Sequence, residues 1–225
     1  MQSISTYEHR LDFLRKYVPG KDVLEIGPAE LVGTTHRNKL ERWPHQIIKN
    51  LAKSLSGLEK NLQQVRALQE QGYNIFPGDA ENFDLGKRYD VIFAGEVIEH
   101  LSNPGQFLKC ARKHLHPGGT LLITTPNRFS IRALRSIILE NKVPKYRKLI
   151  NGHTAYYDIR SLEHLLEREG FLIKELGYYL RFEDSKSGNG FTKLVYWFLT
   201  RFRCHLLPGI VATATPVETE TEPHG

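Results

Sequence analysis

The sequence predicts a single α/β domain in which a mostly parallel β-sheet is flanked by helices on both faces. Short apolar runs alternate with segments of helical periodicity, which is the pattern of successive βαβ units. The strongest run, 89–94 (YDVIFA), is apolar almost throughout. Such continuous apolar character suits a strand in the middle of a parallel sheet that is covered on both faces.

The first part of the chain is predicted to hold two helices and three strands. Helices are assigned where apolar residues recur every three or four positions, and strands where short apolar runs meet glycine or proline. These elements are a helix over 7–18, a strand over 22–26, a strand over 52–58, a helix over 61–71 and a strand over 73–76. Residues 29–53 lack clean periodicity.

The second part continues the alternation from the strand at 89–94. Asn103-Pro104 is predicted to begin a helix, with proline at a tolerated first-turn position, and the run His116-Pro-Gly-Gly119 to end it. The later elements are a strand over 120–125, helices over 131–139 and 161–169, a strand over 171–180 and a helical segment over about 190–207. The domain is expected to span 1–211 with its core at about 20–180, and the Thr-, Glu- and Pro-rich residues 212–225 are expected to form a disordered tail.

Composition indicates a water-soluble globular domain. The 225 residues are 40% hydrophobic and 25% charged, which is enough to bury one sizeable core. Cys110 and Cys204 have no partner at metal-ligand spacing, so we expect neither a metal site nor a disulfide framework. The N-terminal stretch lacks the apolar core of a signal peptide, and no apolar run approaches the roughly 18 residues of a spanning helix. A cytoplasmic location is therefore expected.

The charge balance permits an acidic partner without requiring one. The formal net charge is +6 and the isoelectric point is about 9.2. Nucleic acid, anionic lipid or a phosphorylated substrate would all suit a basic surface. The basic residues are scattered along the chain rather than grouped, which favours a mildly basic surface with no specific role.

Three acidic residues follow the first three strands of the predicted sheet. Glu25 lies at the turn that leaves the first strand, Glu59 follows the second and Asp79 follows the third. Open α/β sheets bind ligands at the carboxyl ends of their strands. A carboxylate after the second strand can accept both hydroxyls of a ribose, and one after the third can receive the exocyclic amine of adenine. Gly27 lets the backbone pass close to such a ligand.

Four segments together resemble a known family. They are 23–27 (VLEIG), 78–81 (GDAE), 89–101 (YDVIFAGEVIEHL) and 115–127 (LHPGGTLLITTPN). In these segments the chain resembles the class I S-adenosylmethionine-dependent methyltransferases, and in particular the branch that contains the ubiquinone-biosynthesis O-methyltransferases. The resemblance covers about residues 20 to 180. It implies a Rossmann-like fold and S-adenosylmethionine as the cofactor.

The resemblance also implies roles for five residues at the cofactor. Glu25 and Gly27 would shape the methionine pocket, and Glu59 would hold the ribose. Asp79 and the backbone of Ala80 would read the adenine.

Two further residues are implied at the reacting methyl group. Glu96 would line the floor near the sulfonium, and His100 would lie beside the methyl group. A hydroxyl acceptor benefits from a base whose pKa is near the working pH, which favours histidine. His100 and His153 are therefore the candidate catalytic residues. A purely structural role, as a helix cap for His100 or a backbone partner for His153, stays open for both.

Two regions of the chain admit more than one interpretation. Residues 30–55 form a longer connection than this family normally needs and are predicted to be a lid or a substrate-binding insertion. Ala29, just before them, stands at the place of the family's usual second glycine. Residues 191–207 mix aromatic and basic side chains. A helix that covers the active site is the favoured interpretation, and an interfacial helix that touches a membrane or a lipid-like substrate is the alternative.

The function predicted for the chain is methyl transfer to an oxygen of a small molecule, a lipid precursor or a sugar. Nitrogen and carbon acceptors, and the oligomeric state, stay open. A nicotinamide-dependent oxidoreductase is disfavoured because 27–33 (GPAELVG) does not provide G-x-G-x-x-G. A nucleic-acid acceptor is disfavoured because no Asn- or Asp-Pro-Pro-aromatic run follows the fourth strand. A non-catalytic module that binds the cofactor or scaffolds a partner is the alternative function.

Overall fold

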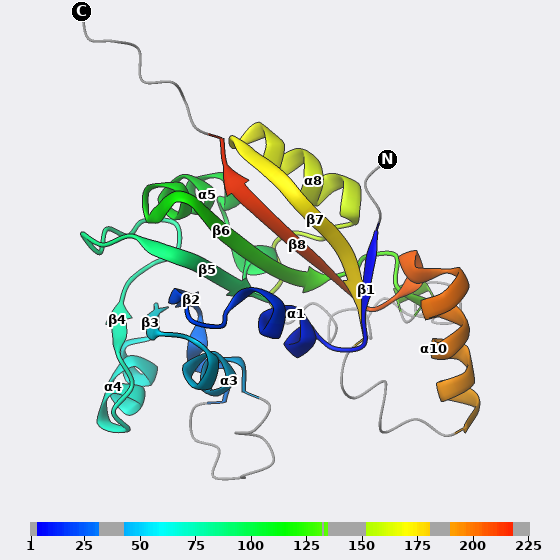
Figure 1. The fold of residues 1–225 in the computed structure, drawn as a ribbon, viewed down its shortest axis with the longest axis horizontal. Helices are drawn as coiled ribbons and strands as arrows, with labels where there is room; N and C mark the ends of the chain where they lie inside the picture. Colours follow the sequence, from blue (N-terminus) through cyan, green and yellow to red (C-terminus); the bar gives the residue numbers. More distant parts are fainter. Residues whose placement is uncertain (1–3, 32–42, 132, 135–151, 181–189, 218–225) are drawn as a thin grey trace, which may run out of the picture.

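The protein folds around an eight-stranded sheet in the computed structural model, which describes residues 4–31, 43–131, 133–134, 152–180 and 190–217 (Figure 1). Its strands are β1 (Ser5–Tyr7), β2 (Asp22–Ile26), β3 (Ser54–Glu59), β4 (Ile75–Pro77), β5 (Tyr89–Gly95), β6 (Leu115–Pro126), β7 (Phe171–Tyr179) and β8 (Gly209–Pro216). Their order across the sheet is β1-β7-β8-β6-β5-β2-β3-β4. Strand β8 runs antiparallel to both of its neighbours, whereas the other pairs are parallel. The predicted fold class is confirmed.

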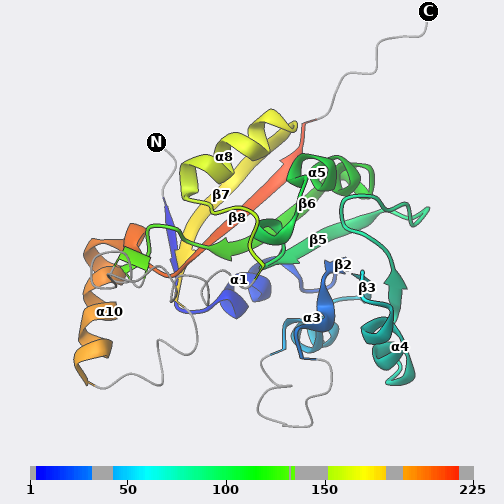
Figure 2. The ribbon, with the colours of Figure 1, turned by 180° about the vertical axis from the view of Figure 1, so that it is seen from behind.

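Helices cover both faces of this sheet (Figures 1 and 2). They are α1 (Arg10–Tyr17), α3 (Pro44–Leu51), α4 (Leu62–Glu70), α5 (Pro104–Lys113), α8 (Ile159–Arg168) and α10 (Gly190–Phe202), with short 3-10 turns η1 (Pro28–Leu31), η2 (Ile98–His100) and η3 (Cys204–Leu206). The helices α1 and α3 bury apolar side chains in one core cluster, and α5 and α8 do so in another.

Strand β5 shows why the central run is apolar almost throughout. Val91 and Phe93 point into the cluster beneath α1 and α3, whereas Ile92 and Ala94 point into the cluster beneath α5 and α8. Successive side chains of a strand alternate between its two faces, so a strand that is covered on both faces needs apolar residues at every position. All four side chains are buried.

Side-chain caps begin three of the predicted helices. Asn61 accepts hydrogen bonds from the first-turn backbone of α4, and Asn103 accepts one from Gln106 N–H before Pro104 begins α5. Asp158 forms a capping box with Ser161 at the start of α8. Such caps satisfy backbone donors that the first turn of a helix leaves without partners. They fix the positions at which the predicted helices begin.

The prediction of a lid or substrate-binding insertion over 30–55 is wrong for its second half. Residues 44–51 form helix α3, whose Pro44, His45 and Ile48 are buried, and Ser54 already belongs to β3. The apolar periodicity of this helix is not apparent in the sequence, because one of the inward-facing residues of α3 is a histidine. Residues 32–42 lie outside the described part of the chain.

The prediction of a disordered tail over 212–225 is wrong for residues 212–216, which lie in β8 between β6 and β7. Ala212, Thr213 and Ala214 are almost fully buried there. Their small side chains resemble a polar, low-complexity tail in the sequence, although they are buried on the faces of the sheet. The domain therefore extends beyond 211. Residues 218–225 lie outside the described residues, as does most of the predicted helix over 131–139.

Two smaller differences concern the strands. The run His116–Gly119 does not simply end a helix, because it loops out within β6, where the pairing with β5 moves from Leu115 opposite Tyr89 to Thr120 opposite Val91. Strand β1 was not predicted, since three residues carry no periodicity of their own. It forms because its backbone completes the free edge of β7.

Candidate functional site

The predicted site residues gather at one edge of the sheet. Strands β2 to β6 are parallel, so their carboxyl ends meet at the same edge. The segments that leave these strands contain Gly27, Asp79 and Glu96, and Glu59 is the last residue of β3. The segment 98–100, which follows β5, brings in His100.

Gly27 adopts a backbone conformation that favours glycine. Its φ is +70°, and a Cβ atom at this position would lie 3.2 Å from Cγ2 of Val97. Its N–H donates to the carbonyl oxygen of Leu58 at 2.9 Å. The glycine thus lets the chain turn sharply from β2 into η1 while staying close to β3.

Glu25 does not lie in that turn, contrary to the prediction. It is the fourth residue of β2, only 3% exposed, and its Oε2 lies 2.6 Å from Nδ1 of His45. His45, on helix α3, is 1% exposed. The carboxylate is therefore engaged with α3 through Oε2.

Glu59 and Asp79 present two carboxylates at the ends of β3 and β4. Glu59 Oε1 accepts a hydrogen bond of 2.9 Å from the N–H of Asn61. Asp79 Oδ2 accepts one of 2.6 Å from Lys60 Nζ, and Oδ1 accepts one of 3.0 Å from Glu81 N–H. The hydrogen bond from Lys60, followed by that from Glu81, lowers the pKa of Asp79. Lys60 was not singled out in the sequence, where it is one of many scattered lysines.

Ala80 lies inside a tight turn that follows Asp79. The N–H of Asn82 donates to the carbonyl oxygen of Asp79 at 2.9 Å, and the two residues form an isolated bridge. Ala80 packs against the main core cluster. The turn thus holds the backbone of Ala80 beside the carboxylate of Asp79.

Glu96 has a strained backbone. Its φ of +56° makes it the single non-glycine residue in the left-handed region among the described residues. Holding a side chain in such a conformation costs about 1–3 kcal/mol, and such strain is concentrated at functional sites. The carboxylate Oε1 accepts a hydrogen bond of 2.6 Å from the hydroxyl of Tyr179, at the end of β7. Tyr179 is a residue that sequence reasoning missed, since only the fold brings it to Glu96.

His100 and His153 lie side by side, although they are far apart in the sequence. Their ring centroids are 4.7 Å apart with the planes at 81°. The N–H groups of Thr154 and Ala155 both donate to the carbonyl oxygen of Glu99, at 2.8 and 3.1 Å. These hydrogen bonds attach the segment that carries His153 to η2. The contact between the two imidazole rings is therefore set by the backbone of the fold.

The same place could hold a metal ion. One ligand atom each from Glu99, His100 and His153 lie within 4.8 Å of one another. One carboxylate and two imidazoles form a donor set that suits several divalent transition metals. Glu99 is 1% exposed, and its Oε2 accepts a hydrogen bond of 3.0 Å from Thr125, which orients the carboxylate. The absence of a metal site was predicted from the spacing of the two cysteines. That prediction did not consider a site formed by one carboxylate and two histidines.

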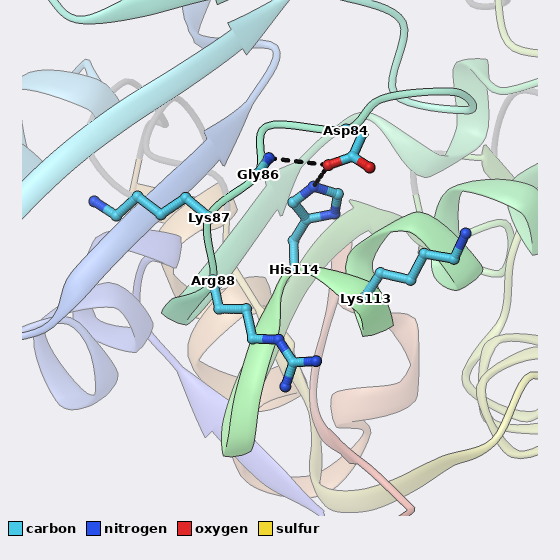
Figure 3. A pocket seen from close by; sticks show the side chains of 6 residues that line it. All are labelled: Asp84, Gly86, Lys87, Arg88, Lys113 and His114. Carbon is cyan, nitrogen blue, oxygen red and sulfur yellow. Dashed lines mark hydrogen bonds and ion pairs between the residues drawn. The ribbon is translucent and has the colours of Figure 1, made fainter.

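A hollow of about 200 Å³ lies at the opposite edge, where β5 begins (Figure 3). It is lined by Asp84, Gly86, Lys87, Arg88, Lys113 and His114. The three cationic side chains point away from one another in Figure 3. His114 Nε2 lies 2.9 Å from Leu85 N and 3.5 Å from Asp84 Oδ1, and its Nδ1 lies 2.8 Å from the Cys110 carbonyl oxygen. The hollow lacks both the position and the convergent groups of the predicted site.

Comparison with known proteins identifies the family to which this fold belongs. Residues 5–176 match the family described as "Methyltransferase domain". The ubiquinone biosynthesis O-methyltransferase of Rickettsia canadensis is 26% identical over 127 residues, which are 55% of this chain and 54% of that protein. The chain spans about half the length of the curated relatives it matches.

Two solved structures share the fold. A SAM-dependent methyltransferase from Thermotoga maritima is 18% identical with a TM-score of 0.63, and the match covers 91% of this chain and 86% of that chain. The N-methyltransferase NodS from Bradyrhizobium japonicum, in complex with S-adenosyl-L-homocysteine, is 17% identical with a TM-score of 0.56 and coverages of 93% and 85%.

Proposed function

Because the chain belongs to the class I methyltransferase-domain family, we propose that it transfers a methyl group from S-adenosylmethionine to an oxygen of its acceptor. Binding of S-adenosylmethionine or its product is typical of this family. The observation that carries the proposal is the adjacency of His100 and His153 at the sheet edge to which the predicted cofactor residues belong.

In this proposal the cofactor lies along the carboxyl ends of β2 to β5. Glu59 holds the ribose hydroxyls, while Asp79 and the turn at Ala80 receive the adenine. Lys60 must share Asp79 with the adenine or move aside. Its side chain is 78% exposed, and an exposed ion pair of this kind contributes about 0–1 kcal/mol, so displacing it costs little.

The methyl group would then lie between Glu96 and the histidine pair. Transfer from a sulfonium requires the acceptor atom in line with the breaking bond and at near-attack distance, in a site that excludes water. An alcohol or phenol also loses its proton in the reaction. A neutral imidazole can accept that proton, and we assign this role to His100, with His153 orienting its ring.

Substitution of His100 tests this assignment. His100→Ala is expected to lower turnover by about 10²–10⁴-fold, the usual contribution of a general base, with affinity for S-adenosylhomocysteine unchanged. The acceptor is found first by screening alcohols, phenols and sugars for release of S-adenosylhomocysteine. Unchanged turnover in His100→Ala would remove His100 from the mechanism.

A second function for the same pair is to hold a divalent cation with Glu99. The supporting observation is the grouping of the three ligand atoms within 4.8 Å. A cation there would lower the pKa of an acceptor hydroxyl, so that water could take the proton in place of His100. Turnover that is lost in a chelator and restored by one added metal would favour this function, whereas turnover that is indifferent to chelation would favour His100 as the base.

The acceptor and its location are proposed from α10. Leu194, Trp197, Phe198 and Phe202 are 49–62% exposed, and Arg201 is exposed on the same helix. In the described residues no helix is long and apolar enough to cross a membrane. An aromatic and basic helix face can instead rest on an anionic lipid surface, which suits a lipid-precursor acceptor. Co-sedimentation with phosphatidylglycerol vesicles, lost in Trp197→Ser, tests this assignment.

A non-catalytic module that binds the cofactor or scaffolds a partner is the alternative. Cofactor binding without turnover on any acceptor would favour it.

A further inference from the structure

We infer that His45 is a positioning residue for the cofactor, acting through Glu25 on the turn that follows β2. This inference rests on the proposed function, since it assigns to helix α3 the task of holding the turn on which S-adenosylmethionine would bind. Two hydrogen bonds, one to β2 and one to the turn, and a close approach at Gly57 connect residues 43–45 with this part of the chain.

The first contact is the buried pair of Glu25 and His45. Nδ1 of His45 lies 2.6 Å from Oε2 of Glu25, and the two residues are 1% and 3% exposed. A buried carboxylate is costly unless it is hydrogen-bonded or paired, so His45 is what allows an acid at this place in the strand. Glu25 is separated from Gly27 by one residue.

The second contact ties the turn itself. The indole Nε1–H of Trp43 donates to the carbonyl oxygen of Pro28 at 2.7 Å, and Trp43 is 2% exposed. The chain on either side of Gly27 is therefore fastened to the same short segment, by Glu25 before it and by Pro28 after it. Two fixed points this close together leave the turn little freedom.

The third contact is a close approach that only glycine allows. Gly57 lies opposite Glu25 in the pairing of β2 with β3. A Cβ atom on Gly57 would lie 2.9 Å from Cγ of Pro28 and 3.5 Å from Cε1 of His45. The space next to Gly57 is thus filled by Pro28 of the turn and by the imidazole, together with Ile75, whose Cδ1 would lie 2.6 Å from the added atom.

Tyr73 closes the outer side of this assembly. Its ring centroid lies 5.2 Å from those of both Trp43 and His45, and its hydroxyl donates to Gln46 Oε1 at 2.8 Å. Lys49 Nζ lies 4.4 Å from the centroid of the same ring. The imidazole of His45 is therefore held by aromatic packing on one side and by the carboxylate on the other.

The contacts from α3 can influence ligand binding because the turn at Gly27 has little conformational restriction of its own. Gly27 is permissive by nature, and the turn leads only into the short 3-10 turn η1. A binding loop that is fixed before its ligand arrives loses less conformational entropy when it binds. The contacts from α3 supply that fixation from outside the turn.

The test compares His45→Ala with His45→Asn and with Ile48→Val. Asparagine places a side-chain N–H close to where Nδ1–H of histidine lies, so it can still donate to Glu25. Ile48 is fully buried on the same helix but packs into the cluster that contains Phe13 and Val23. Ile48→Val thus weakens α3 without touching the turn.

Affinity for S-adenosylhomocysteine is measured by isothermal titration at a temperature at which circular dichroism shows every variant to be folded. We expect His45→Ala to bind about tenfold or more weakly, on the scale of the loss that follows removal of a group that orients a metal ligand. His45→Asn should stay within about threefold of the wild type, on the same scale. Ile48→Val should lower Tm and leave the affinity unchanged.

Equal affinity in His45→Ala and the wild type would overturn the inference and leave the proposed function intact. Wild-type protein that is folded but does not bind would overturn both. If His45→Ala does not fold, Trp43→Phe is used once circular dichroism shows it to be folded, since it removes the indole N–H that donates to Pro28 together with part of the buried ring. Weaker binding in that variant supports the inference, and wild-type affinity in it refutes the idea that α3 holds the turn.

Discussion

Replacing Glu175 by glutamine is expected to loosen the N-terminal segment at neutral pH and to do so less in acid. Glu175 lies in β7 and is 8% exposed. Its carboxylate accepts hydrogen bonds from Tyr7 at 2.6 Å, from Lys16 at 2.7 Å and from the hydroxyl of Tyr17. These three residues belong to β1 and α1, so a single carboxylate fastens the start of the chain to the sheet.

The magnitude follows from the pKa of Glu175. Burial by itself raises this pKa, but the hydrogen bonds, chiefly from Lys16, outweigh burial and lower it from 4.5 to about 2. At about 1.4 kcal/mol per pKa unit this is an upper limit of about 3 kcal/mol. Lys16 is 53% exposed and its charge is partly screened by water, so we expect about half of that limit, roughly 1–2 kcal/mol.

The sign of the pH dependence follows from the lowered pKa. A group whose pKa is depressed by folding stabilises the native state above its unfolded pKa, here about 4.5, and loses that contribution as the pH falls through its folded pKa of about 2. The difference in free energy of unfolding between wild type and Glu175→Gln should therefore be full at pH 7 and shrink between about pH 4.5 and 2.

Urea denaturation at pH 7, 5, 4 and 3 measures this difference. Glu167→Gln is the control, since Glu167 is an exposed residue of α8. It should change stability by no more than about 0.5 kcal/mol at any pH. A Glu175→Gln difference that is the same at pH 7 and pH 3 would refute the reasoning, because it would show that the loss does not come from the charge.

Three further predictions concern single side chains at the site and in the sheet. Gly27→Ala should weaken binding of S-adenosylhomocysteine, measured by titration, and lower the free energy of unfolding by roughly 1–2 kcal/mol, measured by denaturation, because a residue with a Cβ atom is strained in the left-handed region. Unchanged affinity and stability would contradict the role of its φ of +70°. Tyr179→Phe, which removes the hydrogen bond to Glu96, should reduce turnover more than cofactor affinity, and equal losses in both would argue against a role at the methyl group. Thr124 is fully buried, and its hydroxyl has no hydrogen-bond partner among the described residues, so Thr124→Val should leave Tm unchanged or raise it, whereas a clear fall would reveal a further partner.

The sequence sufficed for features that depend on local pattern. The alternating burial of β5 follows from an apolar run, and the position of Gly27 follows from the strand that precedes it. His100 and His153 were both singled out as candidate bases, and the structure brings their rings together. The resemblance to a family supplied the fold around them.

Features that depend on distant partners could not be predicted. The inward face of α3 includes His45, which is buried only because Glu25 lies opposite it. The residues of β8 are small and bury themselves only between β6 and β7. Neither helical periodicity nor composition carries information about such a partner. For this reason α3 was predicted to be part of a lid or insertion, and the end of β8 to be part of a disordered tail.

The most direct test of the central claim is isothermal titration of the folded protein with S-adenosylmethionine and S-adenosylhomocysteine. Asp79→Asn and Glu59→Gln each remove one charge of the proposed pocket, and Asp84→Asn removes one at the opposite edge as a control. We expect dissociation constants on the order of micromolar for the wild type and Asp84→Asn, with binding weakened at least tenfold in the two pocket variants. Absence of binding by the folded wild type, or equal binding in all four proteins, would contradict the proposal that this sheet edge is a cofactor site.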